Sequence, residues 1–563
     1  MYRSLAEVAR RAGAALVPLL VVAAPAPVAA WAASAADARE ASGAPTIGEV
    51  TVTARRRAEP ARDVPFAVTT LDATTLAIER VDDTQALFRR VPGLSLTSFD
   101  DGRFAYFQLR GIGPLSQAIS PDDGSVVTYL DGVPQPVYAS EAAYLDLERI
   151  EVLRGPQGTL FGRNSQGGAL NLVTRPPGPV PAARVRTEAG TDRYALAEVA
   201  ASGPLDGERW TAAIAARAST VDGRVPNVAP RGGALGDREV AALRGTLVHT
   251  PGAADGPRWA FTAHADRQDS RPYYYVRRDE PRGAVELDPE NRVRRTAWGA
   301  HASGRVPLRG LELHSITAVN GFDNEQFTDD TDGLIYGPLF GLSPAAFLPP
   351  ASFSDWREDE RRLYQELRAS SAAGAAAAWT AGVAYFRSEF EVELDNRSSF
   401  SPFLNGDRDA SQTIDSLAAF GELSHALGPR LEGALGARWT RDEKRLRATF
   451  AGLGFPGTVA RFEERGERVY ELWTGRASLR WSPIPAATLY ATAGRGAKSG
   501  GFPRFTLSAA LGLPSRAYAA STSWTWEAGA KLRPAGRGLR LDLAAFANSV
   551  RDEQLFVLDF VSF

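Results

Sequence analysis

The chain has 563 residues, which is longer than one ordinary soluble domain, although closed β-barrels can exceed the usual domain size. Its 64 lysines and arginines against 66 aspartates and glutamates leave a net charge of −2, and this balance indicates neither a nucleic-acid partner nor an acidic solvating tail. The absence of cysteine excludes disulfides, thiolate metal sites and thiol catalysis.

The first 35 residues have the three parts of a secretory signal peptide. Arg3, Arg10 and Arg11 come first, an Ala/Leu/Val run follows over residues 12–24, and Ala33-Ser34-Ala35 forms a small-x-small cleavage site. A short amphipathic or buried helix is the alternative interpretation. After residue 35 no run of about eighteen apolar residues occurs, so a mature membrane protein with this sequence has to cross the bilayer as a closed β-barrel.

Residues 36–58 form a polar linker that contains one short β-prone segment. This segment consists of Ile47, Gly48, Glu49, Val50, Thr51, Val52 and Thr53. An exposed strand of this kind can add to the sheet edge of a partner through main-chain hydrogen bonds. A solvated edge strand without a partner is the simpler alternative.

Residues 59–177 have the pattern of a small α+β domain. Alternation and turn residues predict strands over residues 63–71, 104–110, 125–130, 148–153 and 169–174, and a helical turn at Thr84–Phe88. Five glycines separate the last two strands: Gly155, Gly158, Gly162, Gly167 and Gly168. A phosphate-binding loop would need Lys-Ser/Thr after Gly167, so the spacing alone favours an ordinary glycine-rich loop.

The amino-acid sequence of this stretch is more informative about its family than the spacing of its glycines. Residues 154–163 read RGPQGTLFGR and residues 167–176 read GGALNLVTRP. Both resemble the end of the plug domain of TonB-dependent outer-membrane receptors. Three further matches to this family occur in the same order: Phe107-x-Leu-Arg-Gly, Tyr129-Leu-Asp-Gly and Glu148-Arg-Ile-Glu-Val.

The resemblance implies a complete architecture and a set of partners. Residues 59–177 would form an α+β plug inside a transmembrane antiparallel β-barrel of the 22-strand type, which would occupy residues 180–563 of the outer membrane. Residues 47–53 resemble the TonB box, which the TonB protein and its inner-membrane energising complex pull upon. Too few residues precede this box for a periplasmic signalling domain. A monomer in outer-membrane lipid is expected, with no cofactor and no nucleic-acid partner.

Three loops of the plug are the expected contact points for a solute. By resemblance, residues 98–103, 114–124 and 134–140 form apices that face the outside. The side chains there that can hydrogen-bond or stack are Asp100, Asp101, Arg103, Gln117, Gln135 and Tyr138. Ordinary turn residues are the alternative interpretation.

Two arginines at strand ends of the plug are expected to hold it in place. A buried guanidinium at Arg110 or Arg154 would need a carboxylate partner. The resemblance implies that both face the barrel wall and that Glu527 supplies a carboxylate there. We therefore predict a plug–barrel latch of Arg110, Arg154 and Glu527, against the alternative of solvated surface arginines.

From about residue 180 the chain alternates with period two. Trp259, Phe261 and Ala263 share one face of a predicted strand, while Thr262 and His264 share the other. Soluble sandwiches also show this pattern, but its repetition over about four hundred residues, together with 11 tryptophans and 15 tyrosines, favours lipid outside and a polar lumen inside.

Four long polar inserts are expected to be extracellular loops, at residues 267–296, 320–361, 394–411 and 441–471. They contain Tyr273, Tyr274, Tyr275, Arg277, Arg278 and Trp356, which could line a site for an anionic ligand. The five histidines lack metal-ligand spacing, so we predict no metal bound directly by the protein.

The number of residues is small for a barrel of 22 strands. Each strand needs about 9–11 residues in the bilayer, and loops are added to these. Residues 180–563 do not provide this length, and only residues 528–563 follow Glu527. We therefore expect a barrel that is incomplete at its C-terminal side.

Together these features predict energy-coupled import of a scarce solute. A ferric siderophore is the commonest cargo in the family. Cobalamin, a carbohydrate or another chelate remain open, as does a passive substrate-specific porin. The sequence shows no constellation of catalytic residues, so no enzymatic activity is expected.

Overall fold

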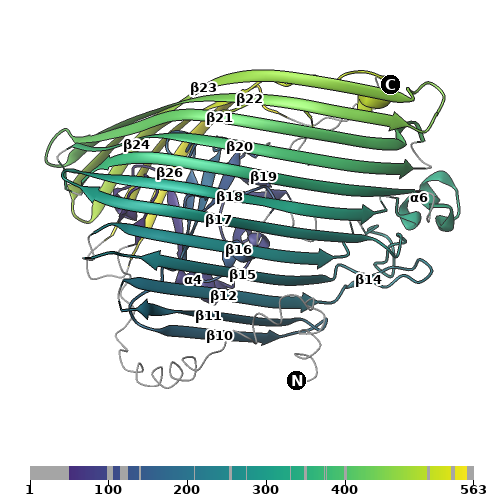
Figure 1. Ribbon diagram of the computed structural model, residues 1–563, viewed down its shortest axis with the longest axis horizontal. Coiled ribbons are helices and arrows are strands. Elements are labelled where there is room, and N and C mark those ends of the chain that lie inside the picture. Colours follow the sequence, from purple (N-terminus) through teal and green to yellow (C-terminus); the bar gives the residue numbers. More distant parts are fainter. Residues whose placement is uncertain are drawn as a thin grey trace.

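The structure is a computed structural model that describes residues 50–554, except 98–105, 115–123, 139–140, 208, 253–255, 274–275, 330, 348–351, 373, 376, 399–401, 504–506 and 534–538. It consists of a first part with short strands and helices and a second part with one large antiparallel sheet (Figure 1). The first part, residues 50–175, is called the plug below. None of the described helices is long and apolar enough to cross a bilayer.

The plug is built around a mixed sheet with the strand order β3-β8-β9-β6-β7, in which only β6 and β9 run parallel. Its elements are β1 (Thr51–Val52), β2 (Glu59–Pro60), η1 (Ala61–Asp63), β3 (Val68–Asp72), α4 (Ala73–Glu79), α5 (Thr84–Phe88), β4 (Leu94–Thr97), β5 (Tyr106–Leu109), β6 (Val126–Leu130), β7 (Val133–Pro134), η2 (Glu141–Tyr144), β8 (Leu147–Arg154) and β9 (Gly168–Thr174).

Local signals explain the two plug helices. Asp72 caps α4 by accepting a hydrogen bond from the amide of Thr75 at 2.8 Å, and Asp83 caps α5 by accepting from Ala86 at 2.6 Å. The sequence predicted α5 and most of the strands, but it did not predict α4. A core that includes Leu87, Phe107 and Ile150, each with no exposed surface, joins these helices to the sheet.

The large sheet contains fifteen strands in simple up-and-down order, each paired with its neighbour in the chain. They are β10 (Ala182–Ala189), β11 (Ala195–Asp206), β12 (Trp210–Val221), β15 (Arg238–His249), β16 (Arg258–Ser270), β17 (Arg292–Leu308), β18 (Leu311–Thr328), β19 (Ser352–Ser371), β20 (Ala377–Ser398), β21 (Gly406–Ala426), β22 (Leu431–Gly452), β23 (Arg461–Ile484), β24 (Ala487–Lys498), β25 (Ser521–Leu532) and β26 (Leu541–Arg551). Its edges are β10 and β26, which are not paired with each other among the described residues. The described residues thus form fifteen strands of this sheet, whereas the expected barrel type has 22.

The two ends of the large sheet differ in their connections. At one end short turns join the strands, for example at residues 309–310, 427–430 and 485–486. At the other end longer segments carry the remaining elements, β13 (Val225–Pro226), β14 (Ala234–Leu235), α6 (Gly333–Phe340), η3 (Pro344–Phe347), η4 (Pro402–Leu404) and η5 (Leu507–Leu511). These are called the short-turn end and the long-loop end below.

The expected long inserts are shorter than predicted because the strands are longer. The insert predicted at 441–471 is mostly strand, since β22 runs to Gly452 and β23 begins at Arg461. The same holds for 394–411, where β20 and β21 leave residues 399–405 as the connection. Strands of 20–24 residues from β19 to β23 exceed the about 9–11 residues that a bilayer requires.

The alternation of the strands separates a polar inner face from an apolar outer face. On β16, Thr262 and His264 are buried, whereas Trp259 and Phe261 are about two-fifths exposed or more. This confirms the predicted faces. The outer face also carries Leu435, Trp473, Trp481, Trp524 and Trp526.

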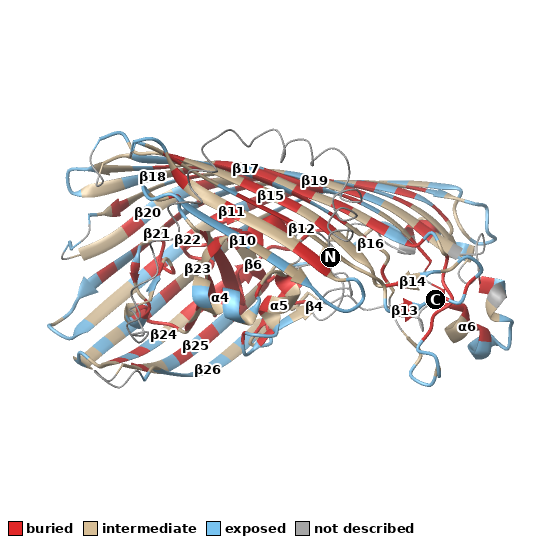
Figure 2. Cartoon of the chain, turned by 90° about the horizontal axis from the view of Figure 1, so that it is seen from below, coloured by how far each residue is buried: buried red, intermediate tan, exposed pale blue. Residues whose placement is uncertain are grey.

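The large sheet curves around the plug, which lies in its hollow (Figure 2). Three hydrophobic clusters contain residues from both parts. In one of them Tyr138 of the plug packs on Phe322 of β18, with ring centroids 4.2 Å apart. Part of the inner face of the sheet therefore packs directly against the plug.

Candidate functional site

Glu527 of β25 is the centre of a buried junction between the plug and the sheet. Its carboxylate forms an ion pair with Arg110, and its Oε1 accepts hydrogen bonds from the amide of Ala67 and the hydroxyl of Tyr490, both at 2.7 Å. The side chains of Arg110 and Glu527 are 6% and 2% exposed. The guanidinium of Arg110 also lies 4.1 Å from the ring centroid of Phe546. This arrangement places two of the three predicted latch residues together.

The third predicted latch residue, Arg154, does not join this pair. It donates to Thr69 Oγ1 at 2.5 Å and to the carbonyl of Pro92 at 3.1 Å. Both partners belong to the plug and neither belongs to the large sheet. Burial lowers the pKa of Arg154, and the neighbouring positive charge of Arg110 lowers it further. The predicted pairing of Arg154 with Glu527 is therefore wrong, because Arg110, the amide of Ala67 and Tyr490 already use that carboxylate.

The described end of the predicted TonB box, residues 50–53, packs against the rest of the plug. Thr51 and Val52 pair with β2, Val52 has no exposed surface, and the amide of Thr53 donates to Glu151 Oε1 at 2.9 Å. The carbonyl of Val50 accepts from the amide of Ala61 at 2.8 Å. The sequence suggested an exposed strand, but this strand pairs within the chain and Val52 is buried in a hydrophobic cluster that includes Val64 and Phe66. Ile47, Gly48 and Glu49 lie outside the described residues.

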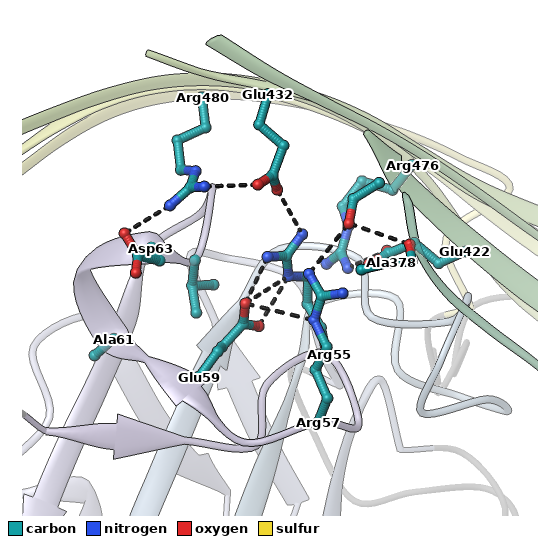
Figure 3. Close-up of polar contacts among 12 residues, drawn as sticks. Arg55, Arg57, Glu59, Ala61, Asp63, Ala378, Glu422, Glu432, Arg476 and Arg480 are labelled. Carbon is teal, nitrogen blue, oxygen red and sulfur yellow. Dashed lines mark hydrogen bonds and ion pairs between the residues drawn. The ribbon is translucent and has the colours of Figure 1, made fainter. Parts of the chain in front are cut away.

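An ion cluster follows this segment and joins it to the short-turn end of the sheet (Figure 3). We call Arg55, Glu59, Asp63, Glu432 and Arg480 the N-terminal clasp. Arg55 Nε donates to Glu59 Oε1 at 2.8 Å, and Arg55 Nη1 donates to Glu432 Oε1 at 3.4 Å. Arg480 bridges the two parts, at 2.6 Å from both Asp63 Oδ1 and Glu432 Oε2. The clasp was not predicted from the sequence, although the run Arg55-Arg56-Arg57 before Glu59 was a signal for it.

Arg56 points the other way and is buried inside the plug–sheet interface. Its backbone has a φ of 58°, and its guanidinium lies 4.4 Å from the ring centroid of Phe161 and 3.8 Å from Glu366. Burial lowers the pKa of Arg56, but the acidic groups around it, of which Glu366 has the largest effect, together outweigh burial and the pKa is raised. The guanidinium is therefore charged and ties residue 56 to β19.

A lysine of the sheet holds the next part of the same segment. Lys531 Nζ donates to the carbonyls of Ala61 and Val64, both at 2.7 Å. Beside these contacts, a cavity of about 1290 Å³ opens among the turns of the short-turn end. Its lining includes Arg55 and Arg57 from the plug and Leu308, Ser371 and Ala426 next to the turns. The N-terminal segment thus borders open space at this end.

The described plug-apex candidates are buried rather than exposed. Tyr138 is 1% exposed, and its hydroxyl donates to Glu358 of β19. Gln135 is 8% exposed and donates to the carbonyl of Val133 at 3.0 Å. Both residues pack at the plug–sheet interface, because the long strands of the large sheet extend alongside this part of the plug. The remaining candidates, Asp100, Asp101, Arg103 and Gln117, lie outside the described residues, as do Tyr274 and Tyr275 of the predicted loop lining.

Within the described ranges, no group of three or more histidine, aspartate or glutamate side chains is arranged to hold a metal ion.

Two buried carboxyl groups, those of Glu286 and Asp332, lie where two loops meet at the long-loop end. Asp332 Oδ1 accepts hydrogen bonds from the amides of Glu286 at 3.0 Å and Leu334 at 2.9 Å, and the amide of Gly333 donates to the carbonyl of Glu286 at 3.0 Å. Burial raises the pKa of Glu286 and of Asp332 above their ordinary values, and the Asp332 charge raises the pKa of Glu286 further.

This contact between loops is expected to weaken as the pH rises. A carboxyl whose folded-state pKa is raised stabilises the folded loop below its ordinary pKa, about 4.3 for glutamate, and this stability is lost as the pH passes the raised value. Hydrogen-exchange protection of residues 284–292, corrected for intrinsic rates, should fall from about pH 4 to pH 7, and Glu286→Gln should remove most of the fall. The exposed neighbour Glu290 provides the control Glu290→Gln, which should keep the wild-type profile. Protection that is constant or rises with pH would contradict the raised pKa values.

Comparison with known proteins agrees with this geometry. Residues 60–169 match the family model of the TonB-dependent receptor plug domain, and residues 237–563 match that of the TonB-dependent receptor-like β-barrel. The pesticin receptor of Yersinia pestis is 24% identical over 496 residues, which are 87% of this chain and 68% of the relative. The ferrichrome outer membrane transporter and phage receptor of Escherichia coli is 29% identical over 179 residues, which are 31% of this chain and 22% of the relative.

Solved structures show the same fold. The ferric yersiniabactin uptake receptor of Yersinia pestis superposes with a TM-score of 0.75 at 20% identity, covering 87% of this chain and 73% of the receptor. The alcaligin outer-membrane receptor of Bordetella pertussis gives a TM-score of 0.59 at 16% identity, covering 89% of this chain and 73% of that receptor. The family model of the β-barrel matches more than half of the chain. Both matched families are families of receptors rather than enzymes. The chain therefore belongs to the TonB-dependent receptor family of the outer membrane.

Proposed function

We propose that the protein binds a ferric siderophore from the long-loop side and imports it when TonB pulls on residues 47–53. The observation that carries this proposal is the position of Val50–Thr53 at the short-turn end. The segment leads directly into the N-terminal clasp and lies beside the large cavity of that end. The relatives named above include receptors of ferric yersiniabactin and ferrichrome, which supports a ferric siderophore as the cargo.

The proposal includes the placement of the chain in the cell. Residues 1–35 act as a signal peptide, residues 36–58 as a linker with the TonB box, residues 59–177 as the plug and residues 180–563 as the membrane barrel. The short-turn end faces the periplasm, where TonB acts, and the long-loop end faces the outside. The outer face of the sheet contacts lipid, and the receptor acts as a monomer.

The contacts of the N-terminal segment suggest how a pull reaches the plug. Between Val50 and Val64, the clasp, Arg56 and Lys531 attach the segment to the sheet through a few charged contacts. Hydrogen bonds to charged groups contribute about 1.5–3 kcal/mol each, whereas the plug core buries many apolar side chains together. A pull on the box therefore separates the segment from the sheet before the core of the plug opens.

The test compares binding and import of radiolabelled ferric siderophore in cells that express box variants. Deletion of residues 47–53 should leave binding to the outer membrane intact and reduce import to background. Val50→Pro should have the same effect, because proline removes the amide that an added strand would use but keeps the carbonyl that Ala61 contacts. The matched variant Val50→Ile keeps the amide and should import at the wild-type rate.

The same assay separates the alternatives. Import that persists after deletion of residues 47–53 would indicate a passive porin and would refute coupling to TonB. Binding and import of cobalamin or a carbohydrate, with no binding of ferric siderophores, would keep the coupling and refute the cargo.

A further inference from the structure

A cavity of about 90 Å³ lies between the plug and the large sheet, away from the short-turn end. Tyr129 and Phe161 line it from the plug, and Tyr364 and Phe386 line it from β19 and β20. The volume is several times the about 10–15 Å³ that one water molecule needs, and it is far below the about 300–1,000 Å³ of pockets for drug-sized ligands. Only a small molecule or ion fits there.

Three arginines also line this cavity, and two of them have carboxylate partners. Arg163 Nε lies 3.0 Å from Asp442 Oδ2, and Arg362 Nε lies 2.7 Å from Glu360 Oε1. Each of these guanidinium charges is therefore balanced by an adjacent carboxylate.

The third arginine, Arg438 of β22, is buried without such a partner. Its Nε donates to Thr440 Oγ1 at 3.1 Å, and its guanidinium lies 5.2 Å from the ring centroid of Phe420. Over the described part of the chain, no carboxylate oxygen is within ion-pair distance of Arg438. Arg438 is 6% exposed, so bulk water does not solvate its charge.

The nearby carboxylate of Glu366 does not supply the missing charge. Arg368 Nη1 lies 2.5 Å from Glu366 Oε1, and Arg56 Nη2 lies 3.8 Å from Glu366 Oε2. One carboxylate therefore already serves two guanidiniums. The surroundings of the cavity keep an excess of positive charge, and a buried unpaired charge costs several kcal/mol.

The backbone leaves room for this guanidinium. Gly162 has a φ of 100°, and a Cβ added there would lie 3.0 Å from Arg438 Nη2. The side chain of Ser416 also lines the cavity. The site thus combines a positive charge, a hydroxyl and aromatic walls around a small cavity.

We propose that a small anion, between a halide ion and a single tetrahedral oxyanion in size, binds in this cavity against Arg438. The anion balances the guanidinium and links β22 to the plug through Arg438 and the loop at Gly162. The site is separate from that of the cargo, since the cavity is too small for a ferric chelate. It does not depend on which solute the receptor imports.

Anomalous diffraction from crystals of the full-length receptor, grown with bromide in place of chloride, tests the site directly. We expect a bromide peak within hydrogen-bond distance of the Arg438 guanidinium, and no peak there in Arg438→Gln. No peak in the wild-type protein, or a peak that persists in Arg438→Gln, would overturn the proposal. The wild-type measurement decides the matter even if the variant does not fold.

Thermal unfolding of the purified receptor in detergent provides the second measurement. At matched ionic strength, phosphate or chloride should raise the unfolding midpoint over gluconate by about 2–4 °C, saturably, because the ion binds the folded state. Arg438→Gln should abolish this difference. Arg244→Gln is the matched control, since Arg244 is also buried but donates to the carbonyls of Ala142 and Asp146, and it should keep the anion dependence. Equal anion dependence in wild type and Arg438→Gln would refute the site.

Discussion

Glu527→Gln is expected to lower the free energy of unfolding by about 3–5 kcal/mol, because it leaves Arg110 as an uncompensated buried charge. The side-chain oxygen of glutamine can still accept the hydrogen bonds of Ala67 and Tyr490, so the loss comes from the ion pair and hydrogen bond with Arg110. The measurement is equilibrium denaturation of the purified receptor, together with the rate of trypsin cleavage within the plug. Both should show a plug that separates more easily from the sheet.

Two further variants control this experiment. Adding Arg110→Met to Glu527→Gln removes the stranded charge and should recover part of the lost stability. Glu463→Gln breaks an exposed pair with Arg461 on β23, whose side chains are 54% and 75% exposed, and should cost about 0–1 kcal/mol. If Glu527→Gln costs no more than this exposed control, the latch does not hold the plug.

Gly168→Ala is expected to be the next most damaging change, at about 2–5 kcal/mol from overpacking and backbone strain together. A Cβ at Gly168 would overlap the carbonyl oxygen of Leu153 and lie 2.6 Å from Leu109 Cδ2, and the φ of Gly168 is 156°. These neighbours belong to β8 and β5 at the centre of the plug, where nothing can move away cheaply. Trypsin sensitivity of the plug, with the barrel intact, is the expected result.

Gly245→Ala on β15 is the matched control for Gly168→Ala. A Cβ at Gly245 would have no atom within 4 Å, so this variant should unfold like the wild type. A plug that remains equally resistant to trypsin in both variants would show that the close approach at Gly168 is not required.

The sequence predicted the elements that depend on local pattern. The helix at Thr84–Phe88 and the strands around Val126–Leu130 and Gly168–Thr174 follow from alternation and turn residues. The inner and outer faces of β16 follow from its period of two. The pairing of Arg110 with Glu527 came from resemblance, since 417 residues separate the two in the chain.

Features that depend on distant partners were not predictable in the same way. Tyr138 looked like an exposed loop residue because its partner Glu358 is 220 residues away. The second half of β22, from residue 441 to Gly452, looked like a polar loop because its outer face is charged there. In the structure Glu443 pairs with Arg441 and Arg445 across this exposed face. These alternating charges therefore continue β22 beyond its apolar outer residues and do not end it.

The contact of Lys531 with the carbonyls of Ala61 and Val64 offers a chemical test of whether the N-terminal segment leaves the barrel wall. The chain contains three lysines, Lys444, Lys498 and Lys531, and all three are at least 95% buried. An amine-reactive reagent should therefore leave the resting receptor almost unacylated at its side chains. Acylation of Lys531, read by mass spectrometry of the peptide that carries it, would mark each molecule whose N-terminal segment has been withdrawn from the wall, without any engineered label.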